Sequence, residues 1–492
     1  MSRNMARERL GTAAVLAAMA LVVLDFGMVN VALPTISLAF SRSPAESMLV
    51  VTAYQLTLLM GLLPGAHLAD RIGYRTLFAA GVLVFAAAAA ASVMAPTLPL
   101  LVAARALQGF GGAAIMALGI ALLRFTLGAE RLGSAIAWNA LVVAVCAAAA
   151  PVVGALIISW FGWRWIFVAG LPLAAAALIA ARALPPVPAN IRSINLLTIA
   201  LYGLAIGAMV MAVEAARSQP VEAVLLLLVG LAAAWWLFFR ERRQNAPIVP
   251  FDLLALRSFR RSVAASVLLF AGQSAGLLAL PFHLQMSLSR SPLTAGMMIA
   301  LWPLAVAATS RIAGRMADKL SVSSVCALGG SVLAAGLAAT VLIPPGWRLA
   351  PLAVCMMVCG IGFGLFQVPN NRNMFLSAPP HRSAAAGGLQ GTARLAGQTA
   401  GALLVAWILA IAPLSMAPQL AIGAAAAAAL ATAVISWSGK SDGVSAGHIE
   451  VADPALSSSV AAGSVRTQCP HSGPVEGRLR CSGSDPASLR AC

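Results

Sequence analysis

The stretch Leu24-Asp25-Phe26-Gly27-Met28-Val29-Asn30-Val31-Ala32-Leu33-Pro34 places one acid inside a long apolar segment. No other charged residue occurs between Arg9 and Arg42, and a helix needs about 20 apolar residues to cross a bilayer. An ionised carboxylate at mid-depth costs roughly 2.5–3.5 kcal/mol on insertion scales, so acids in membrane spans usually have a function. We therefore expect Asp25 to hold or release a proton. The alternative is an acid that only caps a helix or pairs permanently with a cation.

The composition of the whole chain is that of a protein with many membrane spans. Of its 492 residues, 61% are hydrophobic and 10% are charged, whereas soluble domains carry about 25% charged residues. The net charge of +17 could indicate a nucleic-acid partner. The basic residues lie between long apolar runs, however, and form no patch with interleaved aromatic residues. We therefore expect the lipid bilayer, and no nucleic acid, as the partner of this chain.

The apolar runs predict an all-α membrane protein with 14 transmembrane helices. They cover about residues 11–38, 47–66, 76–95, 98–123, 134–159, 163–184, 194–214, 221–239, 262–284, 294–313, 322–343, 350–376, 384–411 and 416–437. Short separations between some runs leave twelve or thirteen spans as alternatives. With the N-terminus inside, twenty Lys and Arg residues before the last span fall on the inner side and five on the outer side. The positive-inside rule then predicts that both termini are cytoplasmic.

A weak internal repeat divides the chain into two halves. The segment Gly65–Arg71 after the second predicted span recurs as Ala313–Lys319 after the tenth. Transporter folds are often built from such repeats, with the binding site between them. The predicted parts are an N-terminal six-helix bundle (1–190), two additional helices (191–240), a cytoplasmic loop (241–261), a C-terminal six-helix bundle (262–437) and a disordered cytoplasmic tail (438–492).

The loop after the second predicted span carries the most specific motif. It reads Gly65-Ala66-His67-Leu68-Ala69-Asp70-Arg71-Ile72-Gly73-Tyr74-Arg75 and resembles the signature loop of the major facilitator superfamily. The resemblance implies that the acid and the arginines of this loop make charge contacts that hold the outward-open state. The motif residues that match are Gly65, Asp70, Arg71, Gly73 and Arg75. In the second half, the corresponding positions are Gly314, Asp318 and Lys319.

Further motifs resemble those of the fourteen-helix drug:proton antiporters, a family of multidrug and quaternary-ammonium exporters. The run Leu24–Pro34 has the Asp, Asn and Leu-Pro of their first-helix motif. The run Arg105–Gly109 in the fourth predicted span resembles a superfamily motif implicated in proton transfer, which implies a role of Arg105 in proton coupling. An arginine at this depth needs a partner or water, and Asp25 is one candidate partner. The alternative is a structural hydrogen-bonding role. In the fifth predicted span Pro151 and Gly154 match the antiporter motif, although Ala or Cys replaces several of its glycines. These replacements are all small, so close helix approach is retained.

Polar and aromatic residues in the spans are candidates for a substrate cavity. Gln390, Arg394 and Gln398 are spaced by four and share a helix face, within a run that resembles the thirteenth span of the same antiporters. The glutamines could equally hold helices together. The candidates are Asn30, Gln55, Gln108, Trp138, Asn139, Gln273, Trp302, Phe366, Gln390 and Arg394.

These observations predict a proton-coupled multidrug efflux transporter of the cell inner membrane. Its partners would be protons and hydrophobic, in particular cationic, small molecules. Neither the spacing of His and Cys residues nor any phosphate-binding motif indicates a metal site, a cofactor or an enzyme. Export of an endogenous metabolite is an alternative, and a polytopic membrane enzyme or a sensor is an alternative of another class.

Overall fold

Helices make up almost all of the described chain, which has no strand. The computed structural model describes residues 2–128, 130–186, 196–217, 219–242, 249–344, 349–379 and 382–438. The first helices are α1 (Ser2–Ala39), α2 (Pro44–Ser47), α3 (Leu49–Ile72), α4 (Tyr74–Met94), α5 (Leu98–Leu127), α6 (Leu132–Phe161), α7 (Trp165–Ala169), α8 (Leu171–Ala181), α9 (Leu196–Ala215) and α10 (Pro220–Glu241). Then follow α11 (Phe251–Ala255), α12 (Arg257–Phe282), the π-helix η1 (His283–Ser287), α13 (Pro292–Lys319), α14 (Val322–Val341), α15 (Leu349–Ser377), α16 (Ser383–Ile411) and α17 (Ala417–Ser438).

Thirteen of the described helical segments are long and apolar enough to cross a membrane, which confirms the predicted all-α membrane fold. The predicted span 163–184 corresponds to a shorter apolar segment, Trp165–Ala181, which is divided at Gly170 into α7 and α8. Pro172 explains the division, because proline has no N–H to donate to the carbonyl four residues earlier. The predicted disordered tail lies, except for Ser438, outside the described residues.

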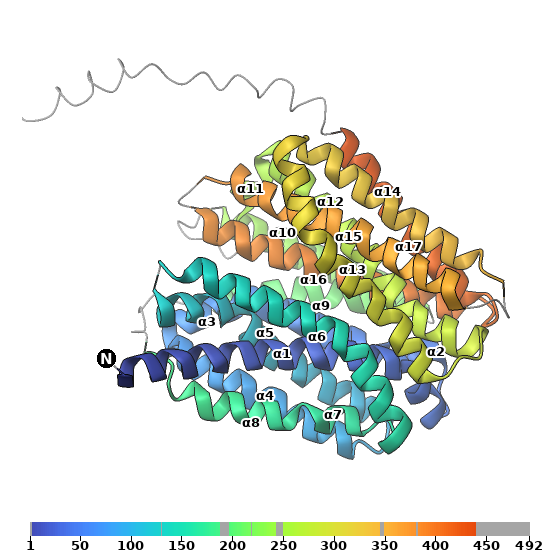
Figure 1. Cartoon of the computed structure of the whole chain (residues 1–492), viewed down its shortest axis with the longest axis horizontal. Helices are drawn as coiled ribbons and strands as arrows, with labels where there is room; N and C mark the ends of the chain where they lie inside the picture. Colours follow the sequence, from blue (N-terminus) through green and yellow to red (C-terminus); the bar gives the residue numbers. More distant parts are fainter. Residues whose placement is uncertain are drawn as a thin grey trace, which may run out of the picture. The chain divides into compact units, whose positions relative to one another are not determined.

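The helices pack in two groups, drawn in different colours in Figure 1. In the first half, defined as α1 to α8, α1 packs against α5, α6 and α8, and α5 also packs against α3 and α4. In the second half, defined as α12 to α17, α12 packs against α16 and α17, and α15 against α13 and α14. Helices α9 and α10 pack against each other, and α9 also contacts α3 and α16.

The two halves contact each other mainly through two pairs of helices. Helix α6 packs against α13, and α3 packs against α16. At the first contact Gly296 of α13 lies so close to α6 that a Cβ there would be 2.4 Å from the Pro151 carbonyl oxygen. Gln285 of η1 adds a polar contact, because its side-chain amide donates a hydrogen bond of 3.2 Å to the Val31 carbonyl of α1.

Small residues also bring α1 and α6 together within the first half. A Cβ on Gly27 would lie 2.5 Å from the Ala150 Cβ, and a Cβ on Gly154 would lie 2.8 Å from the Met28 Cα. Both distances are shorter than any carbon–carbon contact allows, so only glycine fits at these two positions. This contact fixes the position of α1 in the first half, and therefore the position of Asp25.

We predict that Gly154→Val destabilises the protein, whereas Gly133→Val on the same helix does not. The new side chain at residue 154 meets the α1 backbone, and overpacking of this kind costs about 1–3 kcal/mol. Gly133 is exposed, and no atom lies within 4 Å of the place that a Cβ on it would take. The measurement is the thermal unfolding midpoint of each purified variant in detergent. Equal midpoints for both variants would contradict the close α1–α6 contact.

Candidate functional site

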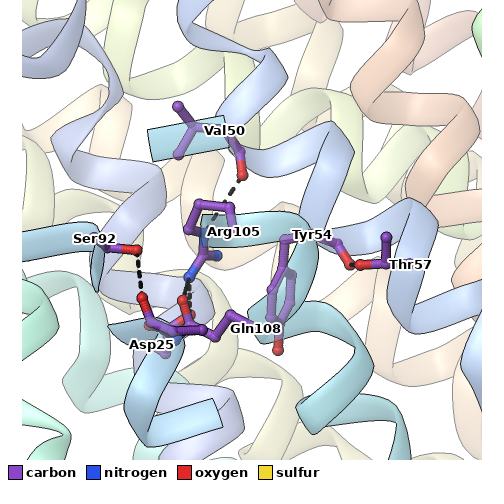
Figure 2. Close-up of polar contacts among 8 residues, drawn as sticks. Asp25, Val50, Tyr54, Thr57, Ser92, Arg105 and Gln108 are labelled. Carbon is purple, nitrogen blue, oxygen red and sulfur yellow. Dashed lines mark hydrogen bonds and ion pairs between the residues drawn. The ribbon is translucent and has the colours of Figure 1, made fainter. Parts of the chain in front are cut away.

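A buried polar cluster joins α1 to α5. The Arg105 Nη1 donates hydrogen bonds to the Asp25 Oδ2 at 2.6 Å and to the Gln108 Oε1 at 2.7 Å. The Gln108 Nε2 donates to the other carboxylate oxygen, Asp25 Oδ1, at 2.9 Å. Figure 2 shows the three side chains directed toward one another. The structure thus brings Asp25 into contact with two residues of α5 that follow it by 80 and 83 positions in the sequence.

Helix α3 completes the surroundings of Arg105. The guanidinium carbon lies 4.3 Å from the centre of the Tyr54 ring, and Nε donates a long hydrogen bond of 3.4 Å to the Val50 carbonyl. Phe167 of α7 lies on another side at 5.8 Å. Aromatic rings attract cations through their electron-rich faces, and more strongly where water is excluded. Tyr54 was not among the residues predicted from the sequence, although a tyrosine beside Gln55 in an apolar span is an available signal.

The cluster is almost completely shielded from solvent. Asp25 is 4% exposed, and Arg105 and Gln108 are 0% exposed. Desolvation of two charges is costly, and removal of one partner leaves the other charge buried and uncompensated. Protonation of Asp25 would have this effect, because it would neutralise the carboxylate and leave the Arg105 charge without its counterion. The predicted role of Asp25 and Arg105 in proton coupling stays a prediction.

A small cavity adjoins Asp25, and no residue of α5 lines it. It is lined by Asp25 and Met28 of α1, by Phe85 and Ala89 of α4, and by residues next to the α7–α8 division at Gly170. The Asp25 side chain therefore faces the interior of the first half, and it does not face lipid.

Two further candidates on α1 and α3 are buried polar side chains. Asn30 is 7% exposed and Gln55 is 2% exposed. The Asn30 Oδ1 and both polar side-chain atoms of Gln55 have no hydrogen-bond partner among the described residues. Buried amides without partners carry a free-energy cost of about 1–3 kcal/mol each, so both are suited to hydrogen bonding with a bound molecule.

The remaining candidates lie apart from the Asp25 cluster. Trp302 and Phe366 are fully buried in a hydrophobic cluster that contains residues of both halves. Trp138 of α6 is 58% exposed, and Gln273 of α12 is half-buried. The Oδ1 of Asn139 is buried without a partner among the described residues.

Gln390 and Arg394 of α16 face different neighbours. The Gln390 Nε2 donates to the Asn371 Oδ1 of α15 at 3.2 Å. Arg394 contacts the first half, where its Nη2 lies 4.0 Å from the Met116 sulfur of α5.

The motif loop forms a tight connection between α3 and α4. Gly73 has φ of +89°, a conformation that side chains other than glycine rarely adopt. The Tyr74 hydroxyl donates to the Asp70 carboxylate at 2.7 Å. Among the described residues no basic side chain lies within ion-pair distance of Asp70. The charge contacts implied for Asp70, Arg71 and Arg75 remain a prediction for another conformation.

The equivalent loop of the second half does contain an ion pair. Asp318, at the end of α13, accepts a hydrogen bond from Arg372 near the end of α15. Lys319 is exposed, and Gly314 faces open space. Gly65 of the first half, by contrast, faces Ala117 of α5, 3.6 Å from where a Cβ would lie. The two repeat loops therefore differ in how they attach to the neighbouring helices.

We predict that Tyr54→Phe retains the stability of the protein and Tyr54→Leu lowers it. The phenylalanine keeps a ring over Arg105 and removes a hydroxyl that has no partner among the described residues. The leucine removes the ring and with it an interaction of about 0.5–2 kcal/mol. The thermal unfolding midpoints of the two purified variants in detergent provide the comparison. A lower midpoint for Tyr54→Phe than for Tyr54→Leu would show that the hydroxyl, and not the ring, is what supports Arg105.

Comparison with known proteins matches the sequence of this chain to a family of transporters. A family model described as the Major Facilitator Superfamily matches residues 15–402. The chain is 37% identical over 406 residues to the uncharacterized transporter YebQ of Escherichia coli (strain K12), covering 79% of this chain and 86% of that protein. It is 26% identical over 375 residues to the riboflavin transporter RibZ of Clostridioides difficile, covering 75% and 81%. It is 29% identical over 392 residues to the multidrug efflux pump LfrA of Mycolicibacterium smegmatis, covering 77% of each.

A solved structure shares the fold. The crystal structure of the peptide transporter POT in complex with sulfate superposes with a TM-score of 0.68 at 18% identity, and the match covers 88% of this chain and 94% of that one. The relatives are transporters rather than enzymes. Because the family model matches well over half of the sequence, this chain belongs to the Major Facilitator Superfamily.

Proposed function

We propose that this transporter is a proton-coupled antiporter that exports hydrophobic, in particular cationic, compounds across the cell inner membrane. The observation that carries the proposal is the buried Asp25 carboxylate held by Arg105 and Gln108. The similarity to the multidrug efflux pump LfrA supports export of foreign compounds.

The coupling we propose follows from competition for one carboxylate. An ionised Asp25 attracts Arg105 or a cationic substrate, whereas a protonated Asp25 attracts neither. Binding of a proton therefore favours release of the substrate cation, and binding of the cation favours release of the proton. The membrane potential contributes roughly 2.3 kcal/mol per charge per 100 mV, which is available for the exchange when more positive charge enters than leaves.

The direction of transport in the proposal depends on cytoplasmic termini. The excess of arginine in one set of loops supports this orientation, because positively charged loops remain inside. In the proposed cycle the transport site is exposed alternately to the two sides of the membrane as the halves rock. The α6–α13 contact at Gly296 and the Asp318–Arg372 ion pair are contacts that such rocking would have to reorganise.

We predict that Asp25→Asn abolishes proton-driven efflux and that Glu222→Gln does not. Asparagine has nearly the shape of aspartate but cannot exchange a proton. Glu222 is an exposed acid in the first turn of α10, so its replacement controls for loss of a carboxylate as such. The measurement is ethidium transport by inverted membrane vesicles under an imposed pH gradient, with variants matched for expression. Wild-type rates in Asp25→Asn vesicles would contradict the proposed coupling.

Export of an endogenous aromatic metabolite is the second candidate function. The similarity to the riboflavin transporter RibZ favours it, and buried amides such as Gln55 suit a neutral ligand with several hydrogen-bonding groups. The same vesicles distinguish the two candidates. We expect uptake of ethidium and none of radiolabelled riboflavin, and the reverse result would favour the metabolite.

A further inference from the structure

A second deep cation lies in α16, away from the Asp25 cluster. Arg394 is eleven residues from the start of α16 at Ser383, or about 16 Å along the helix at 1.5 Å per residue. Its Nε is buried and has no hydrogen-bond partner among the described residues. Its one polar contact within the described chain is the Met116 sulfur at 4.0 Å, and a thioether is only a weak acceptor.

No acid in the described chain neutralises Arg394. The one carboxylate in the middle of a described span, Asp25, is already bound to Arg105 and Gln108. The other acids that form ion pairs there bind other arginines, in the pairs Arg42–Glu46, Arg131–Glu8, Arg217–Glu214, Arg372–Asp318 and Arg382–Asp252. Arg394 is therefore a partly exposed cation deep in a described span, with no ion-pair partner among the described residues. Ionisable residues at such a depth are costly and mark a ligand or ion pathway.

The position of Arg394 is between the two halves. One turn or two before it on α16, Gly391 and Gly388 lie against Leu62 and Leu63 of α3, each about 3.3 Å from where a Cβ would be. The next residue, Leu395, is buried in the hydrophobic cluster of the first half. The guanidinium thus extends from the second half toward α5 of the first half. In transporters built from two repeats, the transported molecule binds between the halves.

We infer that Arg394 is an anion-recognition point of the transport site, which takes amphiphilic substrates that carry a carboxylate. The inference rests on the proposed function and refines its substrate class. The planar guanidinium presents two parallel N–H donors that match a carboxylate, and a carboxylate supplies the counterion that the chain lacks. A substrate with both a cationic group and a carboxylate would then be recognised better than a plain cation, because a plain cation is repelled by Arg394.

Two dyes that differ in a single group test this inference. Rhodamine 110 has a free carboxylate, and rhodamine 123 is its methyl ester, with the same aromatic body. We expect Arg394→Gln in lipid nanodiscs to weaken rhodamine 110 binding about tenfold or more, as loss of a hydrogen bond to a charged group predicts, and to leave rhodamine 123 binding unchanged or slightly stronger. Arg394→Lys, which keeps the charge, should retain most of the preference for rhodamine 110. Fluorescence anisotropy measures both affinities.

The controls separate this inference from the proposed function and from lipid binding. Equal loss of both dyes, or loss of neither, in Arg394→Gln would overturn the inference, whatever the result of the efflux assay. Failure of proton-driven ethidium efflux alone would overturn the proposed function and leave the dye preference standing. Nanodiscs of phosphatidylcholine and nanodiscs with added phosphatidylglycerol should give the same rhodamine 110 affinity. A marked fall in the anionic lipid would instead assign Arg394 to a lipid headgroup and overturn the inference.

Discussion

The ion pair between Asp25 and Arg105 is the constraint on which the first half depends. Two opposite charges that are 0–4% exposed can remain in a medium of low polarity only because each neutralises the other. Gln108 of α5 and Tyr54 of α3 supply further contacts. Neutralisation of Asp25, whether by protonation or by a bound cation, must therefore change contacts in three helices at once.

Close packing is what makes this ion pair possible. Gly27 and Gly154 let α1 and α6 approach at backbone level, and Gly109 and Gly111 let α5 approach α3 and α4. Helices in a bilayer gain no hydrophobic driving force from contact with each other, so such small residues are the main source of tight association. Between the halves, by contrast, the close approach of α13 to α6 is seen at one glycine, Gly296, which lies against the Pro151 carbonyl. The interior of each half is thus fixed by many such positions, while the boundary between the halves has fewer.

The sequence was sufficient for the helices but only partly for the site. Long apolar runs predict membrane helices because hydrocarbon leaves the backbone no other partner than itself, and Asp25, Arg105 and Gln108 stand out as polar residues in such runs. Tyr54 was missed because the sequence does not show that its ring lies against the Arg105 guanidinium, although its place beside Gln55 was an available signal. Helix rotation explains why Trp302 and Phe366 lie in the core. A run that is apolar on every side does not reveal which face turns toward the other half.

The central claim is that Asp25 exchanges a proton for a substrate. The most direct measurement is the number of protons released into weakly buffered solution when tetraphenylphosphonium binds to the purified protein in detergent. The account predicts release from the wild-type protein that disappears in Asp25→Asn while Glu222→Gln still shows it. Binding without any proton release from the wild type, or undiminished release from Asp25→Asn, would contradict it.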